Sequence, residues 1–541
     1  SMGLLAAGIR KNDKVAIISE NCPEWNFIDL GIQQIGAIPV PIYPTVTIDD
    51  YAYIFEHAEV KMIFASTHEL YAKALAASRK LPILQAYSFE PIKDYPHWTD
   101  VWKAGENGDK AALQNAKNAV SEEDLMTIIY TSGTTGRPKG VMLTHKNVVS
   151  NAMAVSDRVP LERGKDKALS FLPLCHIYER TASYLYLYLG VGIYYAESLD
   201  KIGENIREVR PQFFNCVPRL LEKIYNKIIE KAEKLPSLKK KIFYWALNLG
   251  LQYEPHVNQG FFYYLQLKIA DKLVFRKWRE ALGGKLKLMS VAAAAVQPRL
   301  LRIFWAAGIK ICEGYGLTEA SPVVTASLST PKEMRIGCVG VPISGVQVRI
   351  ADDGEILVKG DNVMKGYYKN PQATAEAIDA DGWLHTGDIG EFVEGKYLKI
   401  TDRKKEMFKT SGGKYVAPQV LENKFKECLL IEQIAIVGEG RKFPAALIVP
   451  NFEALREWCV QNGIIYSSPQ EILKNRVVVN KFQKEIDMQN LYFGQWEKVK
   501  KFTLLTQPWT IDSGELTPTL KLKRRIINEK YKTHIEAMYA E

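Results

Sequence analysis

The segment Tyr130-Thr-Ser-Gly-Thr-Thr-Gly-Arg-Pro-Lys-Gly140 follows an apolar run at 125–130 and precedes a helix that we expect to begin near Thr144. Its three glycines let the backbone approach a ligand closely and take positive φ. Its hydroxyls and free amides can point at oxyanions, and Lys139 adds a positive charge. The segment lacks the Gly-Lys-Ser/Thr ending of a Walker A loop. We therefore predict an anion-binding loop rather than a flexible surface turn.

On both sides of this loop, short β-branched runs alternate with helical stretches. The runs predicted to be buried strands lie at 14–19, 61–66, 125–130 and 168–174. Candidate helices follow several of them, for example at 24–36 and 71–81. This alternation predicts α/β architecture with largely parallel sheets.

The pattern changes further along the chain. Residues 221–282 are rich in Lys, Glu and aromatic residues and are predicted to form a helical insertion. Residues 338–400 contain short strands separated by glycine turns, which favours a small β-barrel or β-meander. After Asp402 a helix at 417–428 and further strands restart the pattern. We therefore place the boundaries of an N-terminal domain at 1–402, a hinge at 403–405 and a C-terminal domain at 406–541.

Composition excludes several classes of protein. The chain has 541 residues, 47% of them hydrophobic and 24% charged, which is typical of folded globular proteins and not of disordered or fibrous ones. Its seven cysteines form no CxxC pair, so neither a structural zinc site nor a disulfide framework is expected. The most apolar run, at 181–196, is too short to span a membrane. We expect a cytoplasmic protein that opens with no signal peptide.

The net charge of +10 fits either a nucleic-acid binder or an enzyme that holds anionic nucleotides. Residues 403–541 contain 23 Lys and Arg against 16 Asp and Glu, so +7 of the excess lies there. No basic stripe with interleaved aromatic residues, the pattern of a nucleic-acid module, is found. The local excess therefore favours a small polyanionic nucleotide as ligand and no nucleic acid.

Four further segments follow the glycine and hydroxyl loop in order: Glu313-Gly-Tyr-Gly-Leu-Thr-Glu319, Gly382-Trp-Leu-His-Thr-Gly-Asp388, Asp402-Arg-Lys-Lys405 and Thr517-Pro-Thr-Leu-Lys521. Together the five segments resemble the motifs of the adenylate-forming superfamily, which includes acyl-CoA synthetases, peptide-synthetase adenylation domains and luciferases. The resemblance covers nearly the whole chain. It implies a large N-terminal domain of α/β subdomains with a small β-barrel, and a small mobile α+β C-terminal domain.

The resemblance implies a reaction with ATP, Mg²⁺ and CoA. A carboxylate is joined to AMP with loss of pyrophosphate, and the acyl group then passes to a thiol. Because the substrate carboxylate is the nucleophile, no Ser-His-Asp triad is needed, and catalysis depends on positioning and on neutralising phosphate charge. The loop residues expected to hold the phosphates are Thr131, Ser132, Gly133, Thr134, Thr135, Gly136 and Lys139.

The resemblance also assigns roles to the second and third motifs. Tyr315, between Gly314 and Gly316, would stack on adenine. Thr318 would contact the α-phosphate, and Glu319 would bind Mg²⁺ as a hard oxygen ligand. Asp388 and Arg403 would contact the ribose hydroxyls.

The C-terminal motifs are expected to serve two half-reactions. Lys521 would bridge the attacking carboxylate and the α-phosphate, although Leu520 stands where the family has glycine. Lys405 would be the hinge about which the C-terminal domain rotates. In the second orientation, a loop containing Lys409, Gly412 and Gly413 would line the pantetheine passage. The basic residues at 523–525 are expected to form a solvated start of a helix.

Two segments bear on the substrate. Pro173–Arg180 and Val217–Arg219 resemble long-chain fatty acyl-CoA synthetases, with His176 near the carboxylate end of the acyl pocket. The alternatives are a ligase that loads an acyl carrier protein, and a catalytically silent lipid- or nucleotide-binding homologue.

Residues 291–295, Val-Ala-Ala-Ala-Ala, depart from the glycine-containing family pattern, and their methyl groups are expected to narrow the pocket wall.

The aromatic stretch at 261–269 in the insertion allows two interpretations. One is a patch that associates weakly with a membrane surface and collects fatty acids from lipid. The other, which we favour from the sequence, is a helix packed on the main domain.

Overall fold

The fold is described from a computed structural model. Its first sheet is all parallel and has the strand order β2 (Ile38–Ile42), β1 (Lys14–Ile18), β3 (Val60–Ala65) and β4 (Gln85–Ser88). The structure describes residues 1–83, 85–131, 137–198, 200–404, 406–511, 513–517 and 521–540. Successive side chains of β1 enter cores on opposite faces of the sheet, as the two-residue period of a strand requires. One face is covered by α3 (Ile48–Ala58) and α4 (His68–Ser78), and the other by α1 (Met2–Ala6), α2 (Pro23–Gln33) and α5 (Trp98–Ala104).

The second sheet has the order β13 (Val341–Pro342), β12 (Val323–Ala326), β11 (Ile311–Gly316), β10 (Leu288–Val291), β9 (Phe213–Cys216), β7 (Lys167–Ser170) and β8 (Gly192–Tyr195). Strands β8 to β11 are parallel, and β12 and β13 continue the sheet antiparallel. Its helices are α8 (Ile177–Leu189), α9 (Ile202–Val209) and α14 (Pro298–Ala306). The predicted α/β class is therefore confirmed.

The glycine and hydroxyl loop lies in a small antiparallel sheet that the sequence did not reveal. Strand β5 (Leu125–Thr131) pairs with β6 (Lys139–Thr144), and β6 pairs with β16 (Gly366–Tyr367). The two strands on either side of the loop are therefore paired with each other, and β6 lies between the loop and the predicted helix. The helix itself, α7 (His145–Ser156), begins where predicted, because the Thr144 hydroxyl accepts a hydrogen bond from the backbone N–H of Asn147.

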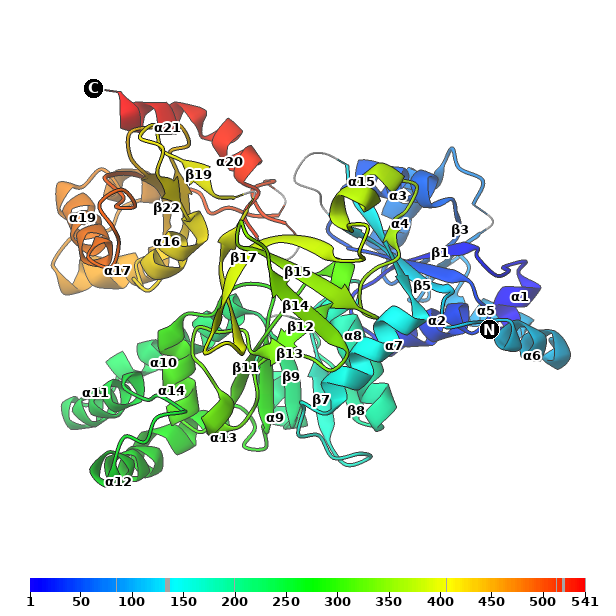
Figure 1. Cartoon of the computed structure of the whole chain (residues 1–541), viewed down its shortest axis with the longest axis horizontal. Coiled ribbons are helices and arrows are strands. Elements are labelled where there is room, and N and C mark those ends of the chain that lie inside the picture. Colours follow the sequence, from blue (N-terminus) through cyan, green and yellow to red (C-terminus); the bar gives the residue numbers. More distant parts are fainter. Residues whose placement is uncertain are drawn as a thin grey trace.

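The predicted helical insertion is confirmed. It comprises α10 (Pro218–Glu233), α11 (Ser237–Leu251), α12 (Phe261–Ala270), a π-helical turn (Asp271–Phe275) and α13 (Arg276–Ala281). Residues of α10, α11, the π turn and α13 share one core with α14. Figure 1 shows α11 and α12 projecting from the lower left of the molecule, away from the first sheet.

The region predicted as a β-barrel or meander is an antiparallel meander. Its sheet has the order β14 (Val346–Ile350), β15 (Glu355–Gly360), β17 (Leu384–Val393) and β18 (Tyr397–Arg403). The helix α15 (Pro371–Ala377) lies between β16 and β17 in the chain. Three short elements lie earlier in the chain: α6 (Lys110–Asn118) and the 3₁₀ turns Thr318–Ala320 and Pro331–Glu333.

The last part of the chain has its own sheet, β21 (Ile431–Val437), β22 (Ala445–Pro450) and β23 (Lys501–Leu504), and a hairpin of β19 (Phe408–Lys409) and β20 (Tyr415–Val416). Its helices are α16 (Pro418–Phe425), α17 (Phe452–Gln461), α18 (Pro469–Ile472), α19 (Arg476–Asn490), α20 (Arg524–Lys530) and α21 (Lys532–Tyr539). Two hydrophobic cores belong to this part alone. It lies beside β17 in Figure 1. The hinge at 403–405 remains a prediction.

A buried ion pair joins the first sheet, the hairpin and the second sheet. Arg180 of α8 and Asp29 of α2 are both 0% exposed, and Arg180 Nη2 donates to Asp29 Oδ1 at 2.5 Å. The other two guanidinium nitrogens of Arg180 also donate: Nη1 to Thr127 Oγ1 of β5 at 2.7 Å, and Nε to the Tyr184 hydroxyl at 2.8 Å. A buried charge is tolerated only when it is paired and hydrogen-bonded in this way.

Replacing Arg180 with Met should lower the free energy of unfolding by about 3–5 kcal/mol, because Asp29 keeps a buried charge without its partner. Urea unfolding followed by fluorescence measures the change. The double variant Asp29→Leu/Arg180→Met should recover most of the loss. As a matched control, Arg276→Ala breaks an exposed pair with Glu280 on α13 and should cost less than about 0.5 kcal/mol. Equal effects of Arg180→Met and Arg276→Ala would contradict the assignment.

Candidate functional site

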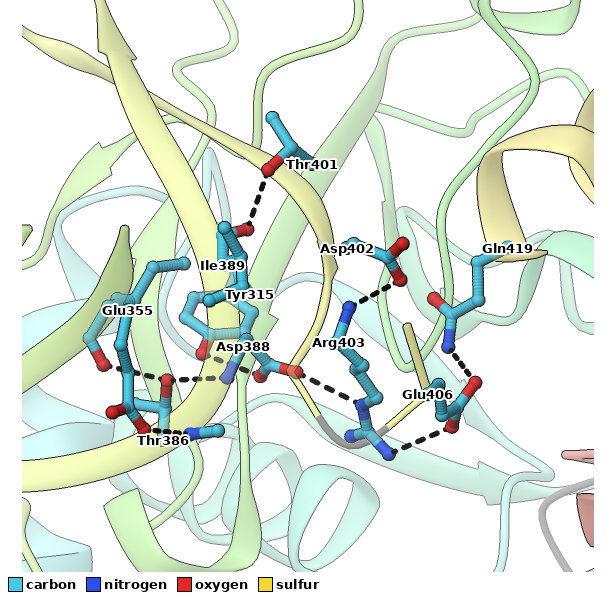
Figure 2. Close-up of polar contacts among 12 residues, drawn as sticks. Tyr315, Glu355, Thr386, Asp388, Ile389, Thr401, Asp402, Arg403, Glu406 and Gln419 are labelled. Atoms are coloured by element: carbon cyan, nitrogen blue, oxygen red, sulfur yellow. Dashed lines mark hydrogen bonds and ion pairs between the residues drawn. The ribbon is translucent and has the colours of Figure 1, made fainter. Parts of the chain in front are cut away.

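Three of the predicted site residues meet at Asp388. Strand β17 places Asp388 directly opposite Arg403 of β18 in the antiparallel register. Arg403 Nε donates to Asp388 Oδ1 at 3.0 Å, and the Tyr315 hydroxyl donates to Asp388 Oδ2 at 2.8 Å (Figure 2). Asp388 is only 5% exposed, so these two donors stabilise a buried carboxylate. Burial and the nearby Asp388 charge hold the pKa of Tyr315 well above its usual value, so its hydroxyl remains a donor.

The turn before Asp388 is fixed by its own hydrogen bonds. The Thr386 hydroxyl accepts from the backbone N–H of Asp388 at 3.1 Å and donates to the Ile356 carbonyl at 2.7 Å. The backbone N–H of Gly387 donates to Glu355 Oε1 at 2.8 Å, and Gly387 has a φ of +73° that favours glycine. The Thr-Gly-Asp sequence therefore points the carboxylate of Asp388 toward Tyr315 and Arg403.

The glycines around Tyr315 differ in what they permit. A Cβ on Gly316 would lie 1.8 Å from the Pro322 carbonyl oxygen, so only glycine fits in the turn between β11 and β12. A Cβ on Gly314 would meet nothing closer than 3.6 Å. Gly316 is therefore required by the fold itself, whereas a side chain at Gly314 would meet no steric conflict. Stacking of Tyr315 on adenine stays a prediction.

Lys521 of the C-terminal part lies in the same site. Burial and the Arg403 charge lower the pKa of Lys521 to about 8, against the opposing charges of Asp388, Glu406 and Glu319. These charges can act on Lys521 only because they lie near it. Lys521 N donates to Thr517 Oγ1 at 3.0 Å, and Thr517 N donates to the Lys521 carbonyl at 2.8 Å.

His176 lies near Lys521. Burial and the Lys521 charge lower the pKa of His176 to about 4, so the imidazole is neutral. His176 Nδ1 accepts from the backbone N–H of Tyr178 at 3.1 Å, which caps the start of α8. Its ring also contacts Tyr43 in an edge-to-face arrangement. The side chain is thus a helix cap that faces the ammonium of the C-terminal part.

Glu319 occupies the 3₁₀ turn at Thr318–Ala320. Its Oε1 accepts a hydrogen bond from the Tyr367 hydroxyl at 2.9 Å, a contact that sequence reasoning missed. Tyr367 is 48 residues away along the chain, and the Gly-Tyr-Tyr sequence that contains it carries no recognisable ligand spacing. A carboxylate oxygen is a ligand that Mg²⁺ prefers, so Glu319 fits the predicted metal.

A chain of ion pairs links Asp388 to the C-terminal part. Arg403 Nη1 lies 3.8 Å from Glu406 Oε1, and Arg524 donates to Glu406 at 3.0 Å and to both oxygens of Glu422 at 2.8 and 2.9 Å. The expected solvated helix start is therefore wrong for Arg524. It holds for Arg525, which is 66% exposed.

Asp402 lies beside this chain of ion pairs. Its Oδ1 accepts from the backbone N–H of Arg403 at 2.6 Å, and burial raises the pKa of its carboxyl to about 6 (Figure 2). Gln419 donates to Glu406 at 2.8 Å and fills the remaining place around that carboxylate. The segment around the predicted hinge is thus dense in buried charge.

Other predicted residues lie elsewhere or outside the described residues. Lys409, Gly412 and Gly413 are exposed in the β19–β20 hairpin, whose backbone bonds to residues 438–441 of the C-terminal part. Thr131 pairs with Lys139 at the base of the phosphate loop, and the Lys139 ammonium lies 5.0 Å from the centre of the Tyr367 ring. The predicted residues outside the described ranges are Ser132, Gly133, Thr134, Thr135, Gly136 and Lys405.

The alanine segment at 291–295 contains a strained residue. Ala293 has a φ of +75°, a conformation that costs a residue with a Cβ roughly 1–2 kcal/mol. The methyl of Ala292 lies 4.0 Å from where a Gly314 Cβ would be, so the alanine segment packs against β11. The departure from the glycine-containing pattern therefore places a side chain where the backbone favours glycine.

Replacing Ala293 with Gly should raise the free energy of unfolding by up to about 1 kcal/mol, because relief of the strain exceeds the added entropy of the unfolded chain. The matched control is Ala294→Gly, at a position without positive φ, which should instead lower it by about 0.4–1 kcal/mol. Thermal unfolding of both variants measures the difference. A loss of stability in Ala293→Gly equal to that in the control would contradict the strain.

Comparisons with known proteins agree with this geometry. Residues 1–368 match the family model of the AMP-binding enzymes, and residues 406–541 match the AMP-binding enzyme C-terminal domain. The long-chain-fatty-acid–CoA ligase FadD15 of Mycobacterium bovis is 35% identical over 545 residues, covering 100% of this chain and 90% of that protein. Long-chain-fatty-acid–CoA ligase 5 of Rattus norvegicus is 33% identical, covering 97% of this chain and 80% of that protein.

Solved structures share the fold. The adenylation domain of a carboxylate reductase from Mycobacterium chelonae superposes with a TM-score of 0.74 and 22% identity, covering 100% of this chain and 82% of that one. The anthranilate CoA ligase AuaEII, in complex with anthranoyl-AMP, gives a TM-score of 0.72 with 17% identity, covering 99% and 92%. The O-succinylbenzoate CoA synthetase of Bacillus subtilis, in complex with ATP and magnesium, gives 0.68 with 17% identity, covering 97% and 91%.

Proposed function

This chain belongs to the AMP-binding enzyme family, and we propose that it converts a long-chain fatty acid and ATP to acyl-AMP and pyrophosphate, then transfers the acyl group to CoA. The observation that carries the proposal is the hydrogen-bonded cluster of Tyr315, Asp388 and Arg403, whose charges act on the buried Lys521 of the C-terminal part. The substrate class rests on the relatives named as long-chain-fatty-acid–CoA ligases, which match over almost the whole chain.

The described residues divide the first half-reaction among them. Asp388 and Arg403 offer acceptors and donors to the ribose. Glu319 would hold Mg²⁺, which supplies positive charge against the phosphates, and Thr318 would contact the α-phosphate. With a pKa of about 8, Lys521 is mostly protonated at neutral pH and can neutralise charge on both the attacking carboxylate and the α-phosphate.

The second half-reaction requires the active-site lysine to leave. Lys521 reaches the site from the C-terminal part, so rotation about the predicted hinge at Lys405 would withdraw it and admit the loop containing Lys409, Gly412 and Gly413. The net charge of +7 in residues 403–541 suits an approach to anionic CoA. Transfer to an acyl carrier protein, or a silent binding role, gains no support from relatives named as CoA ligases.

Replacing Lys521 with Ala should reduce acyl-AMP formation by at least about 10²-fold, because one preorganised charge on the reacting groups is lost. Pyrophosphate release over acids of increasing chain length measures the first step. Thioester formation from supplied acyl-AMP and CoA should be nearly unchanged. The matched control is Lys523→Ala, two residues away and outside the site. Equal loss of both half-reactions in Lys521→Ala would contradict the assignment, and no CoA-dependent product in the unaltered enzyme would contradict the proposed function.

The insertion supports weak association with an anionic membrane surface. Tyr263 of α12 donates to the Leu249 carbonyl of α11 at 2.9 Å, so one face of α12 packs as the sequence favoured. The opposite face leaves Phe261 75% exposed and Phe262 77% exposed, and Leu265 and Ile269 are also exposed. Residues 221–282 contain 12 Lys and Arg against 6 Asp and Glu. Exposed aromatic residues beside excess positive charge fit a lipid interface.

The structure excludes one kind of membrane attachment for the part of the chain it describes. No helix there is both long enough and apolar enough to cross a bilayer.

Replacing both Phe261 and Phe262 with Ser should weaken binding to vesicles of mixed phosphatidylcholine and phosphatidylserine by at least about tenfold, since each buried aromatic side chain contributes about 1.5–3 kcal/mol. Vesicle sedimentation at low and high salt measures the fraction of protein bound. High salt should weaken the binding of the unaltered protein. Trp102→Ser is the control, because Trp102 is an exposed aromatic residue (63%) on α5, far from the insertion in sequence. Unchanged binding of the double variant would refute the patch.

A further inference from the structure

The metal-binding turn is held by one segment from a different part of the fold. The Asn362 amide donates to the Ala320 carbonyl at 3.0 Å, and the backbone N–H of Met364 donates to the Glu319 carbonyl at 2.9 Å. Asn362 is 2% exposed, so its bond is shielded from water. The segment is itself tied to α7, because Asn147 donates to the carbonyls of Asp361 and Val363. The backbone of Glu319 therefore has little freedom.

The side chain of Glu319 is restrained by the same segment. The Tyr367 hydroxyl donates to Glu319 Oε1 at 2.9 Å. Tyr367 is fixed in turn, because β16 pairs it with Val141 of β6 and its backbone N–H donates to Thr374 Oγ1 at 2.9 Å. Within the described part of the chain, Glu319 Oε2 makes no hydrogen bond or ion pair. One carboxylate oxygen is thus held by protein, and the other is open.

Tyr367 also contacts the base of the phosphate loop. The Lys139 ammonium lies 5.0 Å from the centre of its ring, within the range of a cation–π interaction. Lys139 begins β6, the strand with which β16 pairs. The same tyrosine therefore touches the predicted metal carboxylate with its hydroxyl and the predicted phosphate lysine with its ring.

We propose that Tyr367 is a positioning residue that orients Glu319 so that Oε2 faces a divalent cation bound with ATP. The inference rests on the proposed function and adds to it a residue that acts on the metal through Glu319. A free glutamate carboxylate rotates broadly about its last torsion, and a hydrogen bond to one oxygen selects a single orientation. Partners of this kind typically change metal affinity by about 10–100-fold when removed.

Tyr367→Phe tests the proposal, because it removes only the hydroxyl and keeps the ring against Lys139. The Mg²⁺ concentration needed for half-maximal ATP binding, measured by calorimetry on the full chain, should rise by about tenfold or more. ATP binding without Mg²⁺ should be unchanged, and high Mg²⁺ should restore acyl-AMP formation. The adjacent Tyr368→Phe is the matched control, since it loses only a 3.3 Å bond from its hydroxyl to Glu59 at the surface and should leave the Mg²⁺ dependence unaltered.

A second variant separates positioning from a structural effect. In a Glu319→Gln background, Tyr367→Phe should cause no further change in Mg²⁺ dependence, because the metal carboxylate is already absent. An unchanged Mg²⁺ requirement in Tyr367→Phe, or equal weakening of ATP binding with and without Mg²⁺, would overturn the inference while leaving the proposed function intact. Absence of Mg²⁺-dependent ATP binding in the unaltered chain would instead count against the proposed function itself.

Discussion

The buried pair of Arg180 and Asp29 fixes the relative positions of the elements that build the site. Both residues are fully buried, and the guanidinium also donates to Thr127 of β5. Helix α8 begins at the His176 cap, and β5 leads into the phosphate loop at Thr131. A buried ion pair requires good geometry from every partner, since a displaced partner leaves an uncompensated charge. The pair therefore constrains His176 and the start of the phosphate loop at the same time.

The rest of the site is assembled by contacts between distant strands. Cross-strand pairing of β17 with β18 brings Arg403 to Asp388, and strand β11 brings Tyr315 to the same carboxylate. From Arg403, ion pairs continue through Glu406 to Arg524, which is three residues after Lys521. The position of Lys521 thus depends on a continuous series of charged contacts between the meander sheet and the C-terminal part.

The excess positive charge has two locations, and they suit different ligands. Residues 403–541 carry +7, next to the proposed nucleotide and CoA chemistry. Residues 221–282 carry a further excess, with 12 basic against 6 acidic residues, beside the exposed phenylalanines of α12. Nucleotide phosphates and lipid headgroups are both anions, so total charge alone could not separate the two surfaces. The exposed aromatic side chains of α12 distinguish the proposed lipid surface from the proposed nucleotide surface.

The sequence by itself determined the α/β class, the helical insertion and the strand-rich region at 338–400, and it predicted the residues of the site, because hydrophobic period and short motifs are local properties of the chain. The tertiary structure decided the rest. Strand β6 was missed because its pairing with β5 depends on a partner strand rather than on its own pattern. The bonds of Arg180 to Asp29 and of Tyr367 to Glu319 join residues 151 and 48 positions apart, and no local spacing encodes such contacts. The left-handed backbone of Ala293 and the burial of Arg524 were likewise invisible in sequence, since both arise from what packs around them.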